Sequence, residues 1–144
     1  TATYLKVSQI KERQRKLELA RVNAERRRAQ EQLENVQDER DAQLEAIRGQ
    51  VSDAAISAAS LSLMSEVVAN GSRKIDDATE AVNSYNEPLQ EARVALTQSR
   101  TRRRVAEKVL ERRESRERKE RQRKIDRNAD EVAATRVANA NNQD

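Results

Sequence analysis

Residues 75–110 read IDDATEAVNSYNEPLQEARVALTQSRTRRRVAEKVL, and the spacing of their apolar residues decides the fold. One line of mostly apolar positions recurs at alternating intervals of three and four residues without a slip: Ile75, Ala78, Val82, Tyr85, Leu89, Ala92, Leu96, Ser99, Arg103, Ala106 and Leu110. This heptad pattern is typical of a left-handed coiled coil. It predicts a helix that buries one narrow stripe against a partner helix.

The first half of the chain contains a matching pattern. The same spacing joins Leu44, Ile47, Val51, Ala54, Ala58, Leu61, Ser65 and Val68. Farther upstream the pattern falls into two frames, one with Val7, Ile10 and Leu17 and a shifted one with Leu33, Val36 and Leu44. A stutter near residues 21–30 would reconcile the frames. The two halves therefore predict two helices that pack against each other.

The clearest turn signal lies in the middle of the chain, at Asn70-Gly71-Ser72. Gly71 suits the left-handed residue that follows a helix, and Ser72 can cap the next one. We therefore expect an all-α fold, an elongated antiparallel two-helix coiled-coil hairpin that forms a single domain over residues 1–144. Its expected parts are a first helix over 4–69, a turn near 69–73, a second helix over 73–137 and a frayed tail over 138–144.

Two residues interrupt the expected helices. Pro88 removes a backbone hydrogen bond inside the second helix, and Gly49 lies inside the first, where Ser52 and Asp53 could cap a new helix. We expect a kink near 49 and another near 88 in helices that are otherwise continuous. The alternative is a shorter hairpin over residues 52–86, hinged against two longer outer helices.

The composition favours helices over a globular core. Of the 144 residues, 35% are apolar and 38% are charged, and the only aromatic residues are Tyr4 and Tyr85. Low hydrophobicity with high charge is also the signature of intrinsic disorder. Against disorder, the net charge is only +4 and the chain holds one proline and two glycines, so helix propensity is high almost throughout. The composition therefore suits a narrow seam between two helices.

Charge is unevenly distributed along the chain. Residues 6–28 hold nine basic residues against three acidic ones, and residues 100–127 hold fourteen against six. In a hairpin folded about Gly71, residue i would lie opposite residue 142 − i, so the basic run Arg100–Arg113 would face the acidic stretch Glu31–Asp41. The other basic stretches would meet at the open end, which holds both termini. We expect an acidic partner there.

The residue types argue against catalysis and against a cofactor or metal. The chain has no histidine and no cysteine, and its two glycines cannot form a phosphate-binding loop. The carboxylates do not cluster in a loop that would bind a metal. We therefore expect no enzyme activity, no cofactor and no metal site.

Membrane and nucleic-acid binding are also disfavoured. No stretch approaches the length of an apolar span, so we expect a soluble, cytoplasmic protein without membrane insertion. The arginines at 102–104 could form a nucleic-acid-binding arm, but acidic residues alternate with the basic ones and aromatic residues for base stacking are absent there. Nucleic acid is therefore not an expected partner.

The chain resembles the FliJ/YscO family of type III secretion systems, which includes HrpO-type members of plant-associated bacteria. The resemblance covers nearly the whole chain in length, in the symmetry of its two arms and in charge. It is carried by the opening LKV…IKER…LELA of residues 5–20 and by AEKVLERR of residues 106–113, continuing to the stretch 127–131.

The resemblance implies a stalk that assists protein export. Its implied partners are the hexameric secretion ATPase, the cytoplasmic domain of the export gate and, in some systems, substrate chaperones, with a monomeric hairpin favoured over a homodimer. The expected partner-binding residues are exposed arginines of the basic stretches: Arg13, Arg15, Arg102, Arg103, Arg104, Arg112, Arg113, Arg116 and Arg118. The alternative is a generic structural coiled coil that acts through homo- or hetero-oligomerisation.

Overall fold

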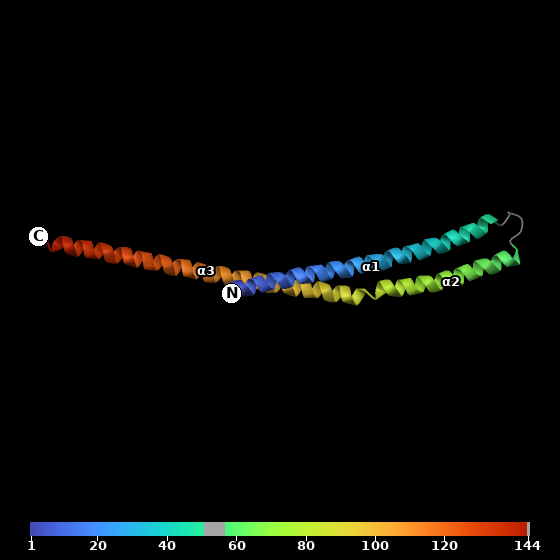
Figure 1. Cartoon of the computed structure of the whole chain (residues 1–144), viewed down its shortest axis with the longest axis horizontal. Helices are drawn as coiled ribbons and strands as arrows, with labels where there is room; N and C mark the ends of the chain where they lie inside the picture. The colour runs from blue at the N-terminus through green and yellow to red at the C-terminus, as the bar shows by residue number, and fades with distance from the viewer. Residues whose placement is uncertain (51–56, 144) are drawn as a thin grey trace. The chain divides into compact units, whose positions relative to one another are not determined.

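A computed structural model describes residues 1–50 and 57–143, and within them the chain forms three helices and no strand. Helix α1 spans Ala2–Gln50 (49 residues), α2 spans Ala58–Asn83 (26 residues) and α3 spans Asn86–Asn141 (56 residues) (Figure 1). The all-α prediction is confirmed. The chain divides into two compact units: unit 1 comprises residues 1–12 and 99–144, and unit 2 comprises residues 13–98. The single domain over 1–144 stays a prediction.

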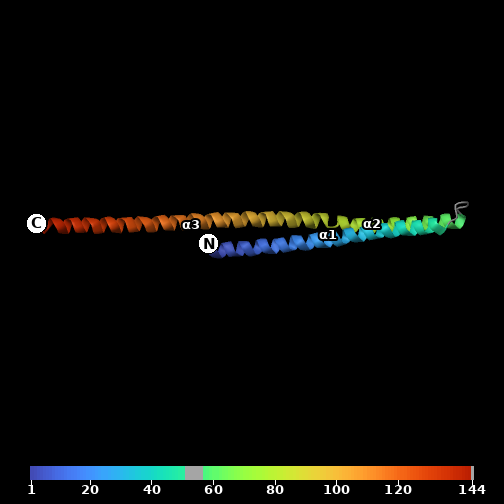
Figure 2. The same cartoon turned by 90° about the horizontal axis from the view of Figure 1, so that it is seen from above.

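Unit 2 is an antiparallel hairpin in which α1 lies beside α2 and the start of α3 (Figure 2). Its core is a narrow seam of apolar side chains and contains no large centre. The buried members come from all three helices: Val22, Val36, Ile47, Ala78, Val82, Leu89, Ala92 and Leu96. Because burial of apolar area is the main favourable term in folding, this single seam stabilises the unit.

The seam predicted over residues 75–110 is confirmed at every position. Seven of its eleven members are buried, and Ile75, Tyr85, Arg103 and Leu110 are half-buried. On α1, the frame of Leu33, Val36 and Leu44 is also correct, since these side chains are buried or half-buried. The frame of Val7, Ile10 and Leu17 is wrong, because these residues are 42%, 54% and 66% exposed. Ser8, Glu12 and Val22 occupy the seam instead.

The predicted turn near 69–73 is wrong. Gly71 is a buried residue of α2, and no described glycine has a positive φ. Facing pairs give the register: Arg40 lies against Gly71 and Glu39 reaches Lys74 in unit 2, and Glu12 reaches Arg100 in unit 1. The residue numbers of these pairs sum to 111–113, whereas a turn at Gly71 would give pairs that sum to 142. The chain therefore reverses between the end of α1 at Gln50 and the start of α2 at Ala58.

Hydrogen bonding by Ser57 explains why α2 begins at Ala58 and not at residue 73, where the second helix is predicted to begin. Ser57 caps it with an extended backbone, and its Oγ accepts a hydrogen bond from the Ser60 amide at 3.1 Å. Asn70, read from the sequence as a helix terminator, instead accepts a hydrogen bond from Arg73 within α2. The predicted first-helix seam therefore fails beyond Ile47: Ala58, Leu61, Ser65 and Val68 are exposed, while Val51 and Ala54 lie outside the described residues.

Gly71 is required by the side chain that crosses it. A Cβ placed on Gly71 would lie 2.8 Å from Cγ and 2.9 Å from Cδ of Arg40. At this crossing both helices step by four residues twice, at Val36, Arg40 and Leu44 on α1 and at Val67, Gly71 and Ile75 on α2. Such a double step locally unwinds a left-handed coiled coil. A stutter therefore lies at this crossing, and α1 makes the same double step at Glu25, Ala29 and Leu33, where a stutter near residues 21–30 is predicted.

Pro88 sets the boundary between α2 and α3. A turn at Ser84–Tyr85 separates α2 from α3, although Ser84 keeps right-handed helical backbone angles. Pro88 falls in the first turn of α3, where its missing N–H has no intrahelical partner to lose. The Leu89 amide bonds the Tyr85 carbonyl at 2.9 Å. The kink predicted near 88 is thus an interruption between two helices.

The other predicted boundaries also change. No kink interrupts α1 at Gly49, which lies within this helix as the structure describes it, Ala2–Gln50. The alternative hairpin over 52–86 is wrong, since Val22 and Ala92 line the same hollow of unit 2 on either side of that segment. The frayed tail begins later than predicted, because α3 continues to Asn141.

Replacement of Gly71 by alanine should destabilise the protein despite the higher helix propensity of alanine. Gly→Ala in a helix gains about 0.5–1 kcal/mol, but overpacking a seam costs about 1–3 kcal/mol. Urea unfolding should therefore show a net loss for Gly71→Ala. In an Arg40→Ala background the same change should instead stabilise.

Gly49→Ala is the matched control, because nothing lies within 4 Å of a Cβ at Gly49. It should be neutral or stabilising by up to about 1 kcal/mol. Stabilisation by Gly71→Ala in the otherwise unchanged chain would show that Arg40 does not cross there.

Candidate partner-binding surface

Unit 1 pairs the first twelve residues with α3 in an antiparallel arrangement. Arg113 Nη1 donates a hydrogen bond to Thr1 Oγ at 2.8 Å, and Glu12 lies against Arg100 and Arg103. Residues 116–143 are exposed on every side. The predicted pairing of Arg100–Arg113 with Glu31–Asp41 is therefore wrong, as is the meeting of two basic stretches at the open end. Both predictions depended on the incorrect turn at Gly71.

The seam of unit 1 is more polar than that of unit 2. Ser8 and Glu12 are each 6% exposed, Ser99 is 9% exposed, and Ala106 is a buried apolar residue beside them. Leu5 and Leu110 are half-buried. Buried polar groups need partners, so the polar contacts of this seam determine which arrangements it can adopt.

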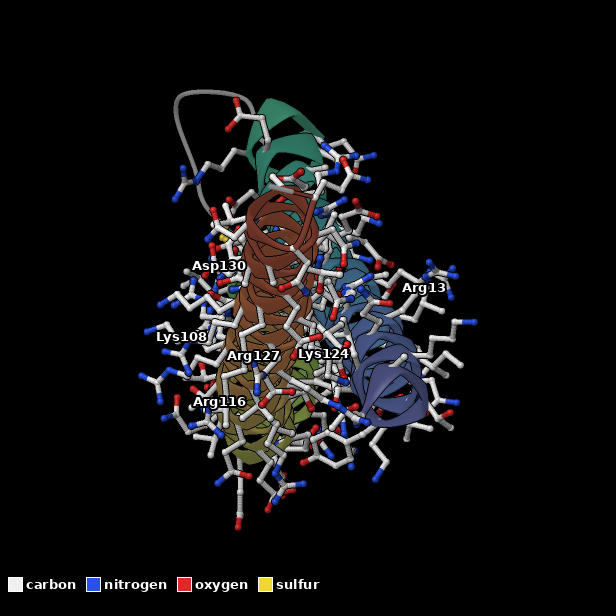
Figure 3. The ribbon with its side chains drawn as sticks, turned by 90° about the vertical axis from the view of Figure 1, so that its left-hand side faces the viewer. Arg13, Lys108, Arg116, Lys124, Arg127 and Asp130 are labelled. Atoms are coloured by element: carbon white, nitrogen blue, oxygen red, sulfur yellow. The ribbon has the colours of Figure 1, made fainter. Side chains whose placement is uncertain are left out.

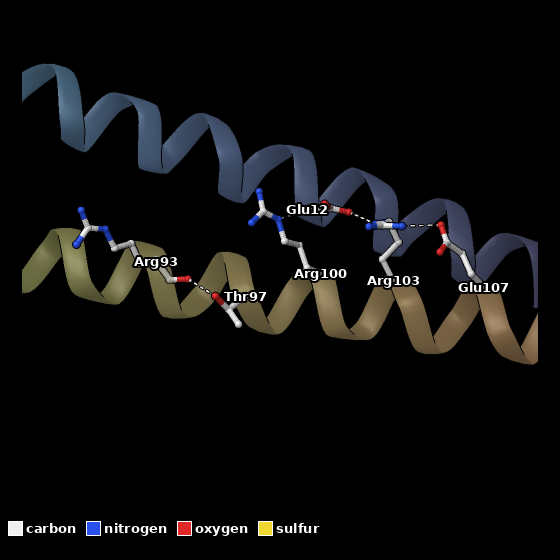
Figure 4. Close-up of polar contacts among 6 residues, drawn as sticks. All are labelled: Glu12, Arg93, Thr97, Arg100, Arg103 and Glu107. Carbon is white, nitrogen blue, oxygen red and sulfur yellow. Dashed lines mark hydrogen bonds and ion pairs between the residues drawn. The ribbon is translucent and has the colours of Figure 1, made fainter.

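Arg103 is the central cation of this seam (Figure 4). Its Nε donates a hydrogen bond to Glu12 Oε2, and its Nη1 donates one to Glu107 Oε1 at 2.6 Å. The pKa of Arg103 is raised, first by the hydrogen bond to Glu107 and then by that to Glu12, while desolvation opposes the change. Arg103 is thus held charged between two carboxylates.

A basic face runs along α3 beside this seam. Because successive helical residues are about 100° apart, one side of α3 collects the following residues: Arg102, Val105, Lys108, Val109, Arg112, Arg113 and Arg116. No acidic residue between 99 and 119 shares this side. Val105 and Val109 are 54% and 47% exposed. We call these seven residues the basic face.

The basic face contains a hollow. Val109, Arg112, Arg113 and Arg116 line a depression of about 350 Å³. Arg113 is fixed in place by Glu117 at 3.2 Å and by Thr1. Figure 3 shows Lys108 and Arg116 projecting from one side of α3, with Lys124 on the other. The face therefore offers apolar contact beside guanidinium groups, of which those of Arg112 and Arg116 can make bidentate hydrogen bonds to a carboxylate.

The structure divides the predicted arginines into groups. Four of them share the basic face: Arg102, Arg112, Arg113 and Arg116. Arg103 is a seam residue, and Arg104 and Arg118 are exposed on other sides of α3. Arg13 and Arg15 belong to unit 2. The partner-binding role of all nine stays a prediction.

Sequence reasoning missed the two valines and Lys108 of the basic face, and it missed Glu12. The valines do not follow the heptad spacing of the seam, but projecting the sequence at 100° per residue would have grouped them with the arginines. Glu12 could be found only with the correct register, because the incorrect turn placed it far from Arg103.

Arg15 lies in a charged cluster of unit 2. It lines a hollow with Glu18, Arg21, Pro88 and other residues. Arg21 Nη2 contacts Glu18 Oε1 at 2.6 Å, and Arg21 Nη1 contacts Glu25 at 2.7 Å. The pKa of Glu18 is lowered, chiefly by the hydrogen bond from Arg21, with desolvation opposing and the charges of Arg21 and Arg15 adding to the effect.

The carboxyl group of Glu18 should titrate below its ordinary pKa of 4.5 in a carbon-detected NMR titration. A pKa lowered by folding gives stability that is present above the unfolded pKa and is lost as the pH falls through the folded pKa. Arg21→Gln should raise the pKa of Glu18 toward 4.5, and Arg48→Gln, in the last turn of α1, should leave it unchanged. An unshifted pKa in the wild-type chain would contradict the ion pair.

Within residues 1–50 and 57–143, no group of three or more metal-ligating side chains comes together. Among the described helices, none has the length and apolar character needed to cross a membrane.

A model of the family described as the flagellar FliJ protein matches residues 2–142. This confirms the FliJ resemblance seen in the sequence. No curated protein and no solved structure matches the chain.

Proposed function

The chain belongs to the FliJ family of flagellar proteins, and from this premise we propose that it is a stalk protein of a type III export apparatus. In this proposal it binds the hexameric secretion ATPase and the export gate on the cytoplasmic side and promotes protein export. FliJ-type proteins are accessory export proteins and not a family of enzymes, which agrees with the proposed role.

The basic face of α3 is the observation that carries the proposal. It presents five cations and two exposed valines without an acidic residue among them. Charged surfaces of this kind speed association with an oppositely charged partner and orient it. The valines supply an apolar centre, which protein interfaces commonly surround with polar residues. An acidic surface of the ATPase is therefore the partner that this face fits best.

The export gate and the substrate chaperones need a surface separate from the basic face. Helix α2 offers one in unit 2, because Leu61, Leu63 and Val68 are 54%, 48% and 47% exposed. Leu61 and Val68 are seven residues apart and share one side of α2, whereas Leu63 lies on the opposite side. Leu61 and Val68 therefore form a small apolar pair that a partner could contact. We assign this part of α2 to the gate or to a chaperone.

Charge reversal on the basic face should abolish binding to the hexameric secretion ATPase of the same organism. The test variant combines Arg102→Glu, Arg112→Glu and Arg116→Glu. Its control combines Arg26→Glu, Arg27→Glu and Arg28→Glu, which make the same change in net charge on exposed residues of unit 2. Fluorescence anisotropy should show binding by the control and a loss of at least about tenfold by the test variant.

If the two variants bind the ATPase with equal affinity, the basic face is not part of the interface with the ATPase. Failure of the unchanged chain to bind any form of the ATPase would contradict the proposed function.

A structural coiled coil that forms homodimers is the alternative. It is favoured by the exposed apolar residues Ile125 (60%), Val132 (51%) and Val137 (61%) in the part of α3 beyond the seam. The seven-residue interval from Ile125 to Val132 would place both on one side of the helix. Two such residues make only a short stripe, whereas stable coiled coils sustain the pattern over several heptads.

Sedimentation velocity at micromolar concentration separates the two functions. We expect a monomer, since each unit already buries its seam within one chain. A dimer that dissociates on Ile125→Ser and Val132→Ser would favour the alternative.

A further inference from the structure

Glu12 is a buried carboxylate held by two arginines of unit 1. Its side chain is 8% exposed, and its two oxygens face different guanidinium groups. Oε1 lies 3.7 Å from Arg100 Nε, and Oε2 accepts the hydrogen bond from Arg103 Nε (Figure 4). Arg100 and Arg103 lie one turn apart on α3 and so form a pincer for a single carboxylate.

Both arginines remain accessible from solvent although Glu12 is not. The side chain of Arg100 is 48% exposed and that of Arg103 is 25% exposed. Arg102, a member of the basic face, lies between them in the sequence but on another side of α3, because successive helical residues are about 100° apart. A carboxylate of a partner helix would therefore reach Arg100 and Arg103 from the side of α3 that faces residues 1–12, where Glu12 now lies.

Apolar contacts hold residues 1–12 only weakly. Ala106 is buried, while Leu5 is half-buried and Tyr4, Val7 and Ile10 are 56%, 42% and 54% exposed. The free energy of burial is roughly proportional to the apolar area removed from water, so this segment gains far less than the seam of unit 2. Polar contacts therefore hold this segment on α3: those of Glu12 with Arg100 and Arg103, and the hydrogen bond from Arg113 to Thr1.

We propose that Arg100 and Arg103 form a binding site for a carboxylate side chain of an acidic partner helix, and that Glu12 is its internal occupant. Binding of the partner displaces residues 1–12 from α3 and opens the half-buried Leu5 and Leu110 seam to an apolar side chain of the same partner. The inference rests on the proposed function for its partner, but the site itself is defined by the three side chains.

Internal occupation lowers the apparent affinity for an outside carboxylate. The apparent dissociation constant equals the intrinsic one divided by the fraction of open sites. If Glu12 fills the site about nine-tenths of the time, then emptying it should tighten binding by about tenfold. Glu12→Gln keeps the size of the side chain and removes the charge that occupies the pincer.

A fluorescein-labelled peptide of eight glutamates serves as the probe, titrated by anisotropy against the full chain. Glu12→Gln should bind it about tenfold more tightly than the unchanged chain. Glu111→Gln is the matched control, because it makes the same charge change at an exposed site on α3 and should give a much smaller gain. Adding Arg100→Gln and Arg103→Gln to Glu12→Gln should abolish the gain. Equal gains for Glu12→Gln and Glu111→Gln would overturn the proposal.

A second measurement needs no change at Glu12. The chain has no cysteine, so spin labels at Gln9→Cys and Lys108→Cys report only the separation of residues 1–12 from α3. Addition of the glutamate peptide should lengthen and broaden the measured distance, and an unchanged distance at saturation would overturn the proposal.

The outcomes distinguish this inference from the proposed function. If the ATPase binds the unchanged chain and Glu12→Gln with equal affinity, the stalk function stands, and the proposal that Glu12 occupies the partner's carboxylate site is wrong. If the ATPase does not bind but the glutamate peptide shows the tenfold gain, the carboxylate site stands and the proposed function fails.

Discussion

A single narrow seam is the constraint on which the structure depends. With 35% apolar residues and two tyrosines, the chain cannot fill a broad core, so each helix buries only one line of small and aliphatic side chains. A seam of this kind has one strong requirement, which is that facing residues stay in register. The contact of Arg40 with Gly71 fixes the register within unit 2, and that of Glu12 with Arg103 fixes it within unit 1.

Much of the fold followed from periodicity, because periodicity records burial directly. The line from Ile75 to Leu110 was correct at every position, since tertiary packing there obeys the simple heptad. The turn could not be placed correctly, because glycine has two physical uses. It permits a left-handed backbone, but it also leaves room for a crossing side chain, and Gly71 serves the second purpose.

The error in the turn determined what could be predicted of the site. Arg102, Arg112, Arg113 and Arg116 were found because net charge needs no knowledge of register. Glu12 was not found, because a buried carboxylate is recognised only when its partner is known. Arg103 shows the same point, since by sequence alone it could not be distinguished from its exposed neighbours, whereas the seam places it against Glu12 and Glu107.

The register can be tested directly, because the chain has no cysteine. Spin labels attached at Glu39→Cys and Lys74→Cys probe two residues whose side chains approach to 3.9 Å across the seam of unit 2. The structure predicts a short and narrow distance distribution between these labels. A long distance for this pair, together with a short one for labels at residues 39 and 103, would contradict it, because that result would place the turn at Gly71 and separate Glu12 from Arg103.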